Sequence, residues 1–257
     1  MNEAVRKVRV SRIPGGGDED AVVVEEPLEI RVGDKAVSVT LRTPGADFDL
    51  AAGFLFTESI LHSPGEIESI RHWGSPNIVR VALHDGVSID MQRLQRHFYA
   101  TSSCGVCGKA SIDALRVAVA PIEDEFVVAS TLLFSLPDVL RSQQTAFDAT
   151  GAIHGAAAFG RDGALLRVRE DIGRHNAVDK VIGSLFLDGK SADILVVSGR
   201  TSFEIVQKCA VARIPILAAV GAPSSLAIEL AHEFGITLLG FVRDGRANVY
   251  AGERRLA

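Results

Sequence analysis

Cysteine is scarce in this chain, with only three among 257 residues. A small, odd number argues against the disulfide framework of a small secreted protein and predicts free thiols in a reducing compartment. The basic N-terminus is followed by a glycine-rich acidic stretch rather than by an apolar run, so the sequence predicts no signal peptide. We therefore expect a cytoplasmic protein.

Long apolar runs and an excess of positive charge are also missing. The most apolar region, 214–231, is broken by Pro215, Gly221 and Pro223 and is too irregular for a membrane-spanning helix. The formal net charge of −5 provides no overall positive field for phosphate backbones. We expect a globular protein with no nucleic-acid partner and no membrane partner. Any anionic ligand must then be bound by a local group of side chains.

The first half of the chain has the pattern of a small α+β domain. Residues 1–20 predict a flexible N-terminal arm, and the alternation of apolar and polar residues over 21–42 predicts a β-hairpin. Asp47 is placed to cap a helix whose apolar residues recur over 48–56. The remaining elements expected in this domain are short strands at 67–72 and 78–83.

The second half alternates apolar strands with helical patterns, which indicates a sheet with crossover helices. The clearest expected elements are a strand at 194–197, a helix at 201–212, a strand at 216–220, a helix at 223–234, a strand at 236–242 and a hairpin turning at Asp244–Gly245. The predicted fold class is thus α/β with two domains. A small α+β domain occupies 21–99, and a larger β/α domain occupies 100–257.

Cys104 and Cys107 lie three residues apart, just before a helical pattern at 109–117. Backbone N–H groups at a helix start stabilise a thiolate, and Lys109 adds positive charge. A nucleophilic thiolate can take sulfur from a donor persulfide, and a second thiol can resolve or relay it. The same spacing also serves zinc and disulfide exchange. Cys209 lies in an apolar helical pattern and is interpreted as core packing.

A polar run at 170–180 stands between a predicted strand and a helix, where open α/β sheets present ligand-binding residues. Arg174, His175 and Lys180 suit phosphates, and Asp171 suits a guanine or ribose donor. The alternative is a capped, solvated helix start.

Two further strand-to-helix junctions are candidate anion sites because of their backbone N–H groups. The first contains Ser198, Gly199 and Arg200, although Thr201 and Glu204 have the spacing of a capping box. The second, 221–225, can also be explained as a helix N-cap. His154 lies among small residues that leave room for a ligand, and we include it as a candidate for proton transfer or binding.

Several longer motifs resemble one family over most of the chain. They are SSCGVCGK at 102–109, EDIGRHNAVDKVIG at 170–183, SGRTSFEIVQK at 198–208, APSSLAIELA at 222–231 and GFVRDGR at 240–246. In this order they resemble the FdhD/NarQ family of formate dehydrogenase accessory proteins.

The resemblance implies a sulfur carrier of the sulfurtransferase type. Such a carrier accepts persulfide sulfur from a cysteine desulfurase and passes it to the molybdenum bis(molybdopterin guanine dinucleotide) cofactor of formate dehydrogenase. The catalytic cysteines would be Cys104 and its partner Cys107.

The family's cofactor-binding stretch falls on Phe241, Val242, Arg243, Asp244, Gly245 and Arg246. The resemblance also implies a cytidine-deaminase-like larger domain and a homodimer. One departure is Gly155, where the family pattern leads us to expect an alanine.

Three rival functions stay open. A zinc-dependent deaminase-like hydrolase would use the cysteine pair and His154 as ligands, but Ala156 stands where such an enzyme needs its glutamate. A thiol–disulfide oxidoreductase would use the pair as a redox switch. A non-catalytic cofactor chaperone would use the cysteines for coordination alone.

Overall fold

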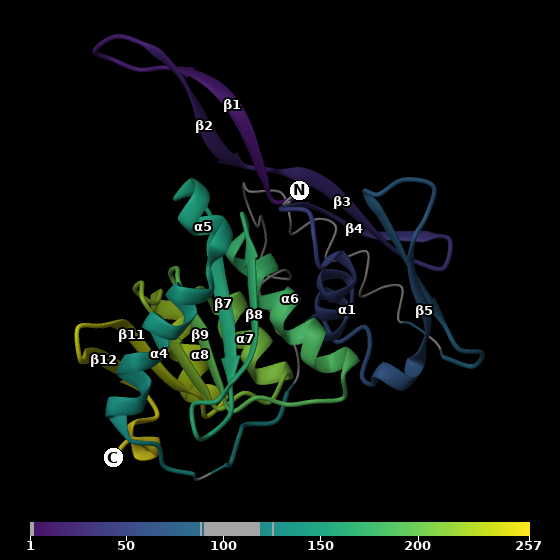
Figure 1. Ribbon diagram of the computed structural model, residues 1–257. Coiled ribbons are helices and arrows are strands. Elements are labelled where there is room, and N and C mark those ends of the chain that lie inside the picture. The colour runs from purple at the N-terminus through teal and green to yellow at the C-terminus, as the bar shows by residue number, and fades with distance from the viewer. Residues whose placement is uncertain (1–2, 88, 90–118, 125) are drawn as a thin grey trace.

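The computed structural model describes residues 3–87, 89, 119–124 and 126–257, which form a mixed α/β structure around three sheets (Figure 1). The predicted α/β class is confirmed. The proposed domain boundary near residue 99 lies outside the described residues, and the division into two domains stays a prediction. None of the helices in the described ranges is long and apolar enough to cross a lipid bilayer.

The N-terminal residues form an antiparallel ribbon that projects away from the rest of the protein (Figure 1). It consists of β1 (Val5–Ser11) and β2 (Gly17–Val23). The sequence predicted a flexible arm without strands over 1–20. The two strands show that this part of the prediction was wrong. Gly15 and Gly16 have positive φ values of 55° and 115°, which suit the tight turn between the strands.

A four-stranded sheet follows, in the order β4-β3-β6-β5. Its strands are β3 (Glu26–Val32), β4 (Lys35–Arg42), β5 (Ile67–His72) and β6 (Ile78–Leu83), and a short 3₁₀ helix, η1 (Pro64–Glu66), precedes β5. β5 and β6 have the predicted bounds. The hairpin of β3 and β4 confirms the expected hairpin for the residues from Glu26 to Arg42. Leu28, Ile30 and Val79 pack on this sheet's inner face against helix α1 (Asp47–Thr57).

The start of α1 differs from the prediction. The cap residue is Ala46 in a left-handed conformation, and no side chain caps the helix. Asp47 instead accepts hydrogen bonds from Arg42 Nε and Nη2 at 3.0 and 2.9 Å, and both side chains are buried. The carboxylate therefore compensates a buried guanidinium rather than the helix end.

The larger sheet has six strands in the order β12-β11-β10-β9-β7-β8. They are β7 (His154–Phe159), β8 (Leu165–Asp171), β9 (Ile194–Val197), β10 (Ile216–Ala219), β11 (Thr237–Arg243) and β12 (Arg246–Ala251), and η3 (Glu253–Arg255) follows. The neighbours β9, β10 and β11 are parallel, as the alternating pattern predicted. β7 runs antiparallel to both β9 and β8.

Alternate residues of the larger sheet face two separate cores. α6 (Arg174–Leu187), α7 (Phe203–Val211) and α8 (Ser225–Glu233) pack on one face with Leu195 and Leu217. α4 (Ser130–Gln143) packs on the opposite face with Val196 and Ala218. The short α5 (Thr145–Thr150) continues from α4 toward the base of the ribbon (Figure 1).

The two sheets are joined by a close contact between α1 and α6. A Cβ added to Gly53 would lie 1.9 Å from the backbone oxygen of Asp179, and a Cβ on Gly183 would lie 1.9 Å from that of Asp49. Only glycine permits the two helix backbones to approach so closely. This pair therefore sets the distance between the smaller sheet and the helices of the larger one.

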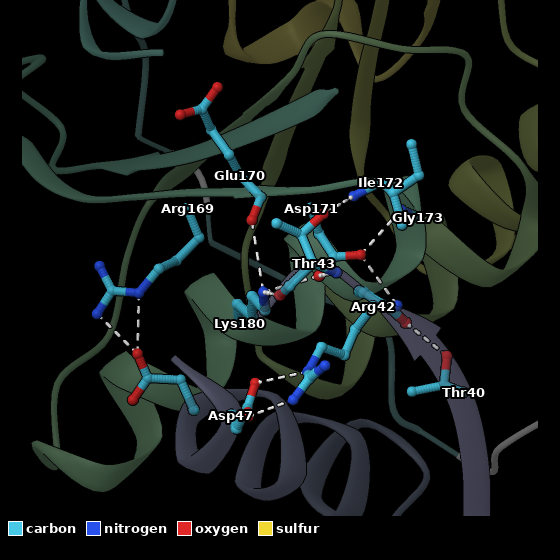
Figure 2. A network of polar contacts seen from close by, with 12 residues as sticks. Thr40, Arg42, Thr43, Asp47, Arg169, Glu170, Asp171, Ile172, Gly173 and Lys180 are labelled. Atoms are coloured by element: carbon cyan, nitrogen blue, oxygen red, sulfur yellow. Dashed lines mark hydrogen bonds and ion pairs between the residues drawn. The ribbon is translucent and has the colours of Figure 1, made fainter. Parts of the chain in front are cut away.

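A buried polar network reinforces this junction (Figure 2). Lys180 of α6 lies 2.7 Å from Asp171 Oδ2 and donates to the backbone oxygen of Thr43, also at 2.7 Å. The Thr43 N–H donates to Asp171, and the Thr43 hydroxyl accepts from the N–H of Ile172. Lys180 and Asp171 are 1% and 0% exposed, so the network exchanges no partners with solvent.

Replacing Gly183 with alanine should destabilise the protein by about 1–3 kcal/mol, because the new methyl group forces α1 and α6 apart. Alanine would otherwise favour an isolated helix. The free energy of unfolding from urea titration measures the change. Gly65→Ala is the control, since its Cβ would meet nothing nearer than Ser63 Oγ at 3.5 Å. Equal stability of the two variants would contradict the close helix contact.

Replacing Lys180 with methionine should cost about 3–5 kcal/mol, because it leaves the Asp171 carboxylate buried without a cation. Lys190→Met removes an exposed pair with Asp188 and should cost less than about 1 kcal/mol. The double variant Asp171→Asn/Lys180→Met should recover part of the loss. The free energy of unfolding of all three variants is measured by urea titration. If Lys180→Met loses no more stability than Lys190→Met, the Lys180–Asp171 pair does not stabilise the junction.

Candidate functional site

Predicted site segments within the described residues meet at one edge of the larger sheet, which we call the rim. Parallel strands β9, β10 and β11 end there at Val197, Ala219 and Arg243. Antiparallel β7 begins at the same edge with His154, which pairs with Asp171 at the end of β8. The carboxyl ends of parallel strands are where open α/β sheets bind ligands.

Backbone contacts connect these segments in series along the rim. Gly155 N–H donates to Ser198 Oγ, and Ser198 N–H donates to the Gly155 oxygen, both at 2.9 Å. The Gly221 N–H donates to the Gly199 oxygen at 3.2 Å, and a Cβ on Gly221 would lie 2.7 Å from that oxygen. Phe241 N–H in turn donates to the Gly221 oxygen at 3.2 Å. The rim is therefore a continuous, closely packed surface.

A cavity of about 690 Å³, which we call the rim cavity, opens beside these contacts. Six of the predicted site residues line it, namely His154, Ser198, Val242, Arg243, Asp244 and Gly245. Its opposite wall consists of residues from α4 and α5. Its size is in the range of small-molecule and cofactor sites.

The β11–β12 turn has strained backbone geometry at the mouth of this cavity. Asp244 and Gly245 have φ values of 52° and 71°, the geometry of a two-residue hairpin turn, which confirms the predicted turn. Phe241 has a φ of 54°, an unusual conformation for a bulky residue, at an irregularity in the strand register. Strain of this kind is concentrated at functional sites.

Positive charge surrounds His154. Burial lowers the pKa of His154, and the nearby Arg174, His175 and Arg200 lower it further, while Asp171 acts in the opposite direction. The imidazole is therefore neutral at neutral pH and offers one donor and one acceptor. A Cβ on Gly199 would lie 3.2 Å from His154 Nδ1, so the 198–200 loop covers the ring closely.

His175 does not line the rim cavity and contacts α7 instead. Its Nε2 lies 2.8 Å from both Ser202 Oγ and Glu204 Oε2, so it links α6 to α7. The hydrogen bond from His175 lowers the pKa of Glu204, against the effect of burial. His175 and Glu204 line a second cleft of about 570 Å³ between β4, α1, α6 and α7. It is separate from the rim cavity.

The other predicted residues divide between the surface and the interior. Arg200, Phe241 and Arg246 are exposed at the rim, and Gly199 and Arg174 are partly buried there. Asp171 and Lys180 are buried in the junction network, where each already has partners in the chain. In this arrangement these two residues hold the rim in place.

The two helix-capping alternatives have different outcomes. Ser224 caps α8 by accepting from the N–H of Ala227 at 3.2 Å, so the simple interpretation of 221–225 holds. At α7 the cap residue is Ser202, without a side-chain bond, and Glu204 pairs with His175 instead. The capping box suggested by Thr201 and Glu204 is therefore not formed.

Sequence reasoning missed one wall of the rim cavity. This wall includes Phe134, Asp138, Arg141, Gln144 and Phe147. No motif marks these positions, although a buried glutamine between two helices is a signal once burial is known. Cys104 and Cys107 lie outside the described residues, as does the helix expected at 109–117.

Comparison with known proteins gives a consistent assignment. The model of the FdhD/NarQ family matches residues 23–257. A protein from Mycolicibacterium paratuberculosis named sulfur carrier protein FdhD is 50% identical over 250 residues, covering 92% of each chain. A protein of the same name from Streptomyces avermitilis is 47% identical and covers 100% of this chain and 97% of its own.

A solved structure shows the same fold. A crystal structure from Desulfotalea psychrophila, assigned as a formate dehydrogenase accessory protein, superposes with a TM-score of 0.76 at 26% identity and covers 98% of both chains. The family match, the relatives and the fold agree with the order of motifs along the sequence. The chain belongs to the FdhD/NarQ family.

Proposed function

We propose that this protein is a sulfur carrier that takes persulfide sulfur from a cysteine desulfurase and delivers it to molybdenum bis(molybdopterin guanine dinucleotide). The modified cofactor would then serve formate dehydrogenase. The names of the relatives support the carrier role. The observation that carries the proposal is the rim cavity, because the predicted site residues His154, Ser198 and Arg243 line one ligand-sized space.

The charge around the rim suits the phosphates of a dinucleotide. Arg243 lines the cavity and is exposed, and Arg200, Arg174 and Arg246 lie at the same edge. Guanidinium groups bind phosphate through paired hydrogen bonds. Because the chain as a whole carries a net charge of −5, this local group supplies the attraction that the whole molecule lacks.

In this proposal Cys104 and Cys107 carry out the sulfur transfer. A Cys104 thiolate attacks the outer sulfur of the donor persulfide, so that a new S–S bond forms, the donor S–S bond breaks and the donor thiolate leaves. Cys107 can then attack the inner sulfur of Cys104. This second step forms a disulfide and releases sulfide to the metal, and a cellular dithiol restores both thiols.

Cys209 is unsuited to this chemistry. It is buried at 0% exposure in the core, and burial raises the pKa of its thiol. A thiol kept protonated and covered is a poor nucleophile. The proposal therefore assigns sulfur to the cysteine pair, with the desulfurase, formate dehydrogenase and a second copy of this chain as the expected partners.

Incubation with a cysteine desulfurase and cysteine should add one sulfur atom to the protein, detected by intact mass spectrometry and removed by a reductant. Cys104→Ala should abolish the addition, because the attacking thiolate is gone. Cys209→Ala is the matched control and should still gain sulfur. If both variants gain sulfur equally, the assignment to Cys104 fails. Cys104→Ala should still bind guanine nucleotide, which distinguishes a carrier from a misfolded chain.

Arg243→Gln should weaken GDP binding about tenfold at low salt, because one charged contact to phosphate is lost. Isothermal titration calorimetry measures the affinity, and the difference from the unmodified protein should shrink as salt rises. Arg254→Gln removes an exposed arginine outside the rim cavity and should have no effect. Equal GDP affinity in Arg243→Gln and Arg254→Gln would show that the β11–β12 turn is not part of the nucleotide site.

A further inference from the structure

One buried polar side chain in the rim cavity has an unpaired hydrogen-bond donor in the described part of the chain. Gln144 is 2% exposed, yet within the described part of the chain its Nε2 has no hydrogen-bond acceptor. Buried donors in native proteins nearly always have an acceptor, so an exception calls for an explanation. Gln144 also lines the rim cavity.

The backbone around Gln144 is held firmly. The residue joins α4 to α5, and its carbonyl oxygen accepts from the Asp148 N–H at 3.0 Å. The Glu170 carboxylate accepts from the N–H groups of Ala146 and Phe147, both at 2.9 Å. The start of α5 is thereby fixed to strand β8. The amide of Gln144 is consequently presented from a rigid position.

Gly155 leaves the space that the amide occupies. A Cβ at this position would lie 2.7 Å from both Cδ and Nε2 of Gln144. A methyl group there would require the amide to move. Gly155 is also the position where the family pattern leads us to expect alanine. The glycine and the buried amide are therefore coupled in this chain.

The surroundings of Gln144 favour an uncharged group of the ligand. Phe134, Leu140, Ile153 and Val242 contribute apolar surface to the same cavity. The cations that line the cavity are more exposed than Gln144. Arg141 has a half-exposed side chain and pairs with Asp148 at 2.6 Å, and Arg243 is exposed at the turn. Phosphates are better met by exposed cations, whereas a neutral acceptor suits a neutral, buried donor.

We infer that Gln144 is a ligand-binding residue whose Nε2 donates to a ring carbonyl or ring nitrogen of a purine base in the rim cavity. The inference rests on the proposed function, in which the base is guanine, with acceptors at O6 and N7. Phe147, with Arg141 placed 4.5 Å over its ring, lines the same cavity as the amide. The α4–α5 segment thus acts as the base-binding side of the cavity.

Gln144→Met tests this role because it keeps the length of the side chain and removes the donor. The full-length protein is titrated with GDP by calorimetry, and its thermal midpoint is recorded without ligand. GDP affinity should fall about fivefold to tenfold, the loss of one neutral hydrogen bond. This loss should be the same at low and high salt. The thermal midpoint should stay unchanged or rise, since no internal bond of Nε2 is lost.

Gln143→Met is the matched control, because Gln143 is an exposed neighbour that does not line the cavity. Its GDP affinity should equal that of the unmodified protein. If Gln144→Met binds GDP normally, the inference is overturned and the proposed function stands. If affinity and thermal midpoint fall together, the side chain is structural and the inference is likewise overturned. If the unmodified protein binds no GDP, both the inference and the proposed cofactor site fail.

Discussion

The contact between the Gly53 and Gly183 regions of α1 and α6 is the constraint on which the site depends. It brings the loop after β4 close enough for Thr43 to reach Asp171 and Lys180. Those two residues stand at the end of β8 and inside α6, on either side of Arg174 and His175. The smaller sheet therefore supports one half of the rim. A shift of α1 would be transmitted directly to the strand end that pairs with His154.

Much of the larger sheet was predictable because its signals are local. The apolar runs of β9 and β10 and the Asp244–Gly245 turn depend on neighbours in sequence, and their positions were anticipated to within a few residues. Strand-to-helix junctions carry polar residues in this kind of fold. Their convergence on one rim follows from parallel strand order, and six residues predicted for the site line one cavity there.

Other features were not predictable from the sequence because they depend on partners distant in sequence, or because one local pattern fits two different structures. Asp47 has the position of a helix cap, but the buried Arg42, which also pairs with Glu26, binds its carboxylate instead. Glu204 has the spacing of a capping box, yet His175 binds it from another helix. Lys180 and Asp171 have the residue types of phosphate and base ligands, and their pairing with each other and with Thr43 depends on segments distant in sequence. Gln144 has no motif at all, and only its burial and missing acceptor single it out.

The projecting ribbon of β1 and β2 has a consequence for encounters between chains. Arg6, Lys7 and Arg9 lie on one strand, and Asp18, Glu19 and Asp20 lie on the other. Open strand edges invite pairing with another polypeptide. Identical edges of two copies would place like charges together, whereas unlike edges would attract each other. The ribbon thereby opposes a symmetric side-by-side association of two such ribbons, and this opposition weakens as ionic strength rises.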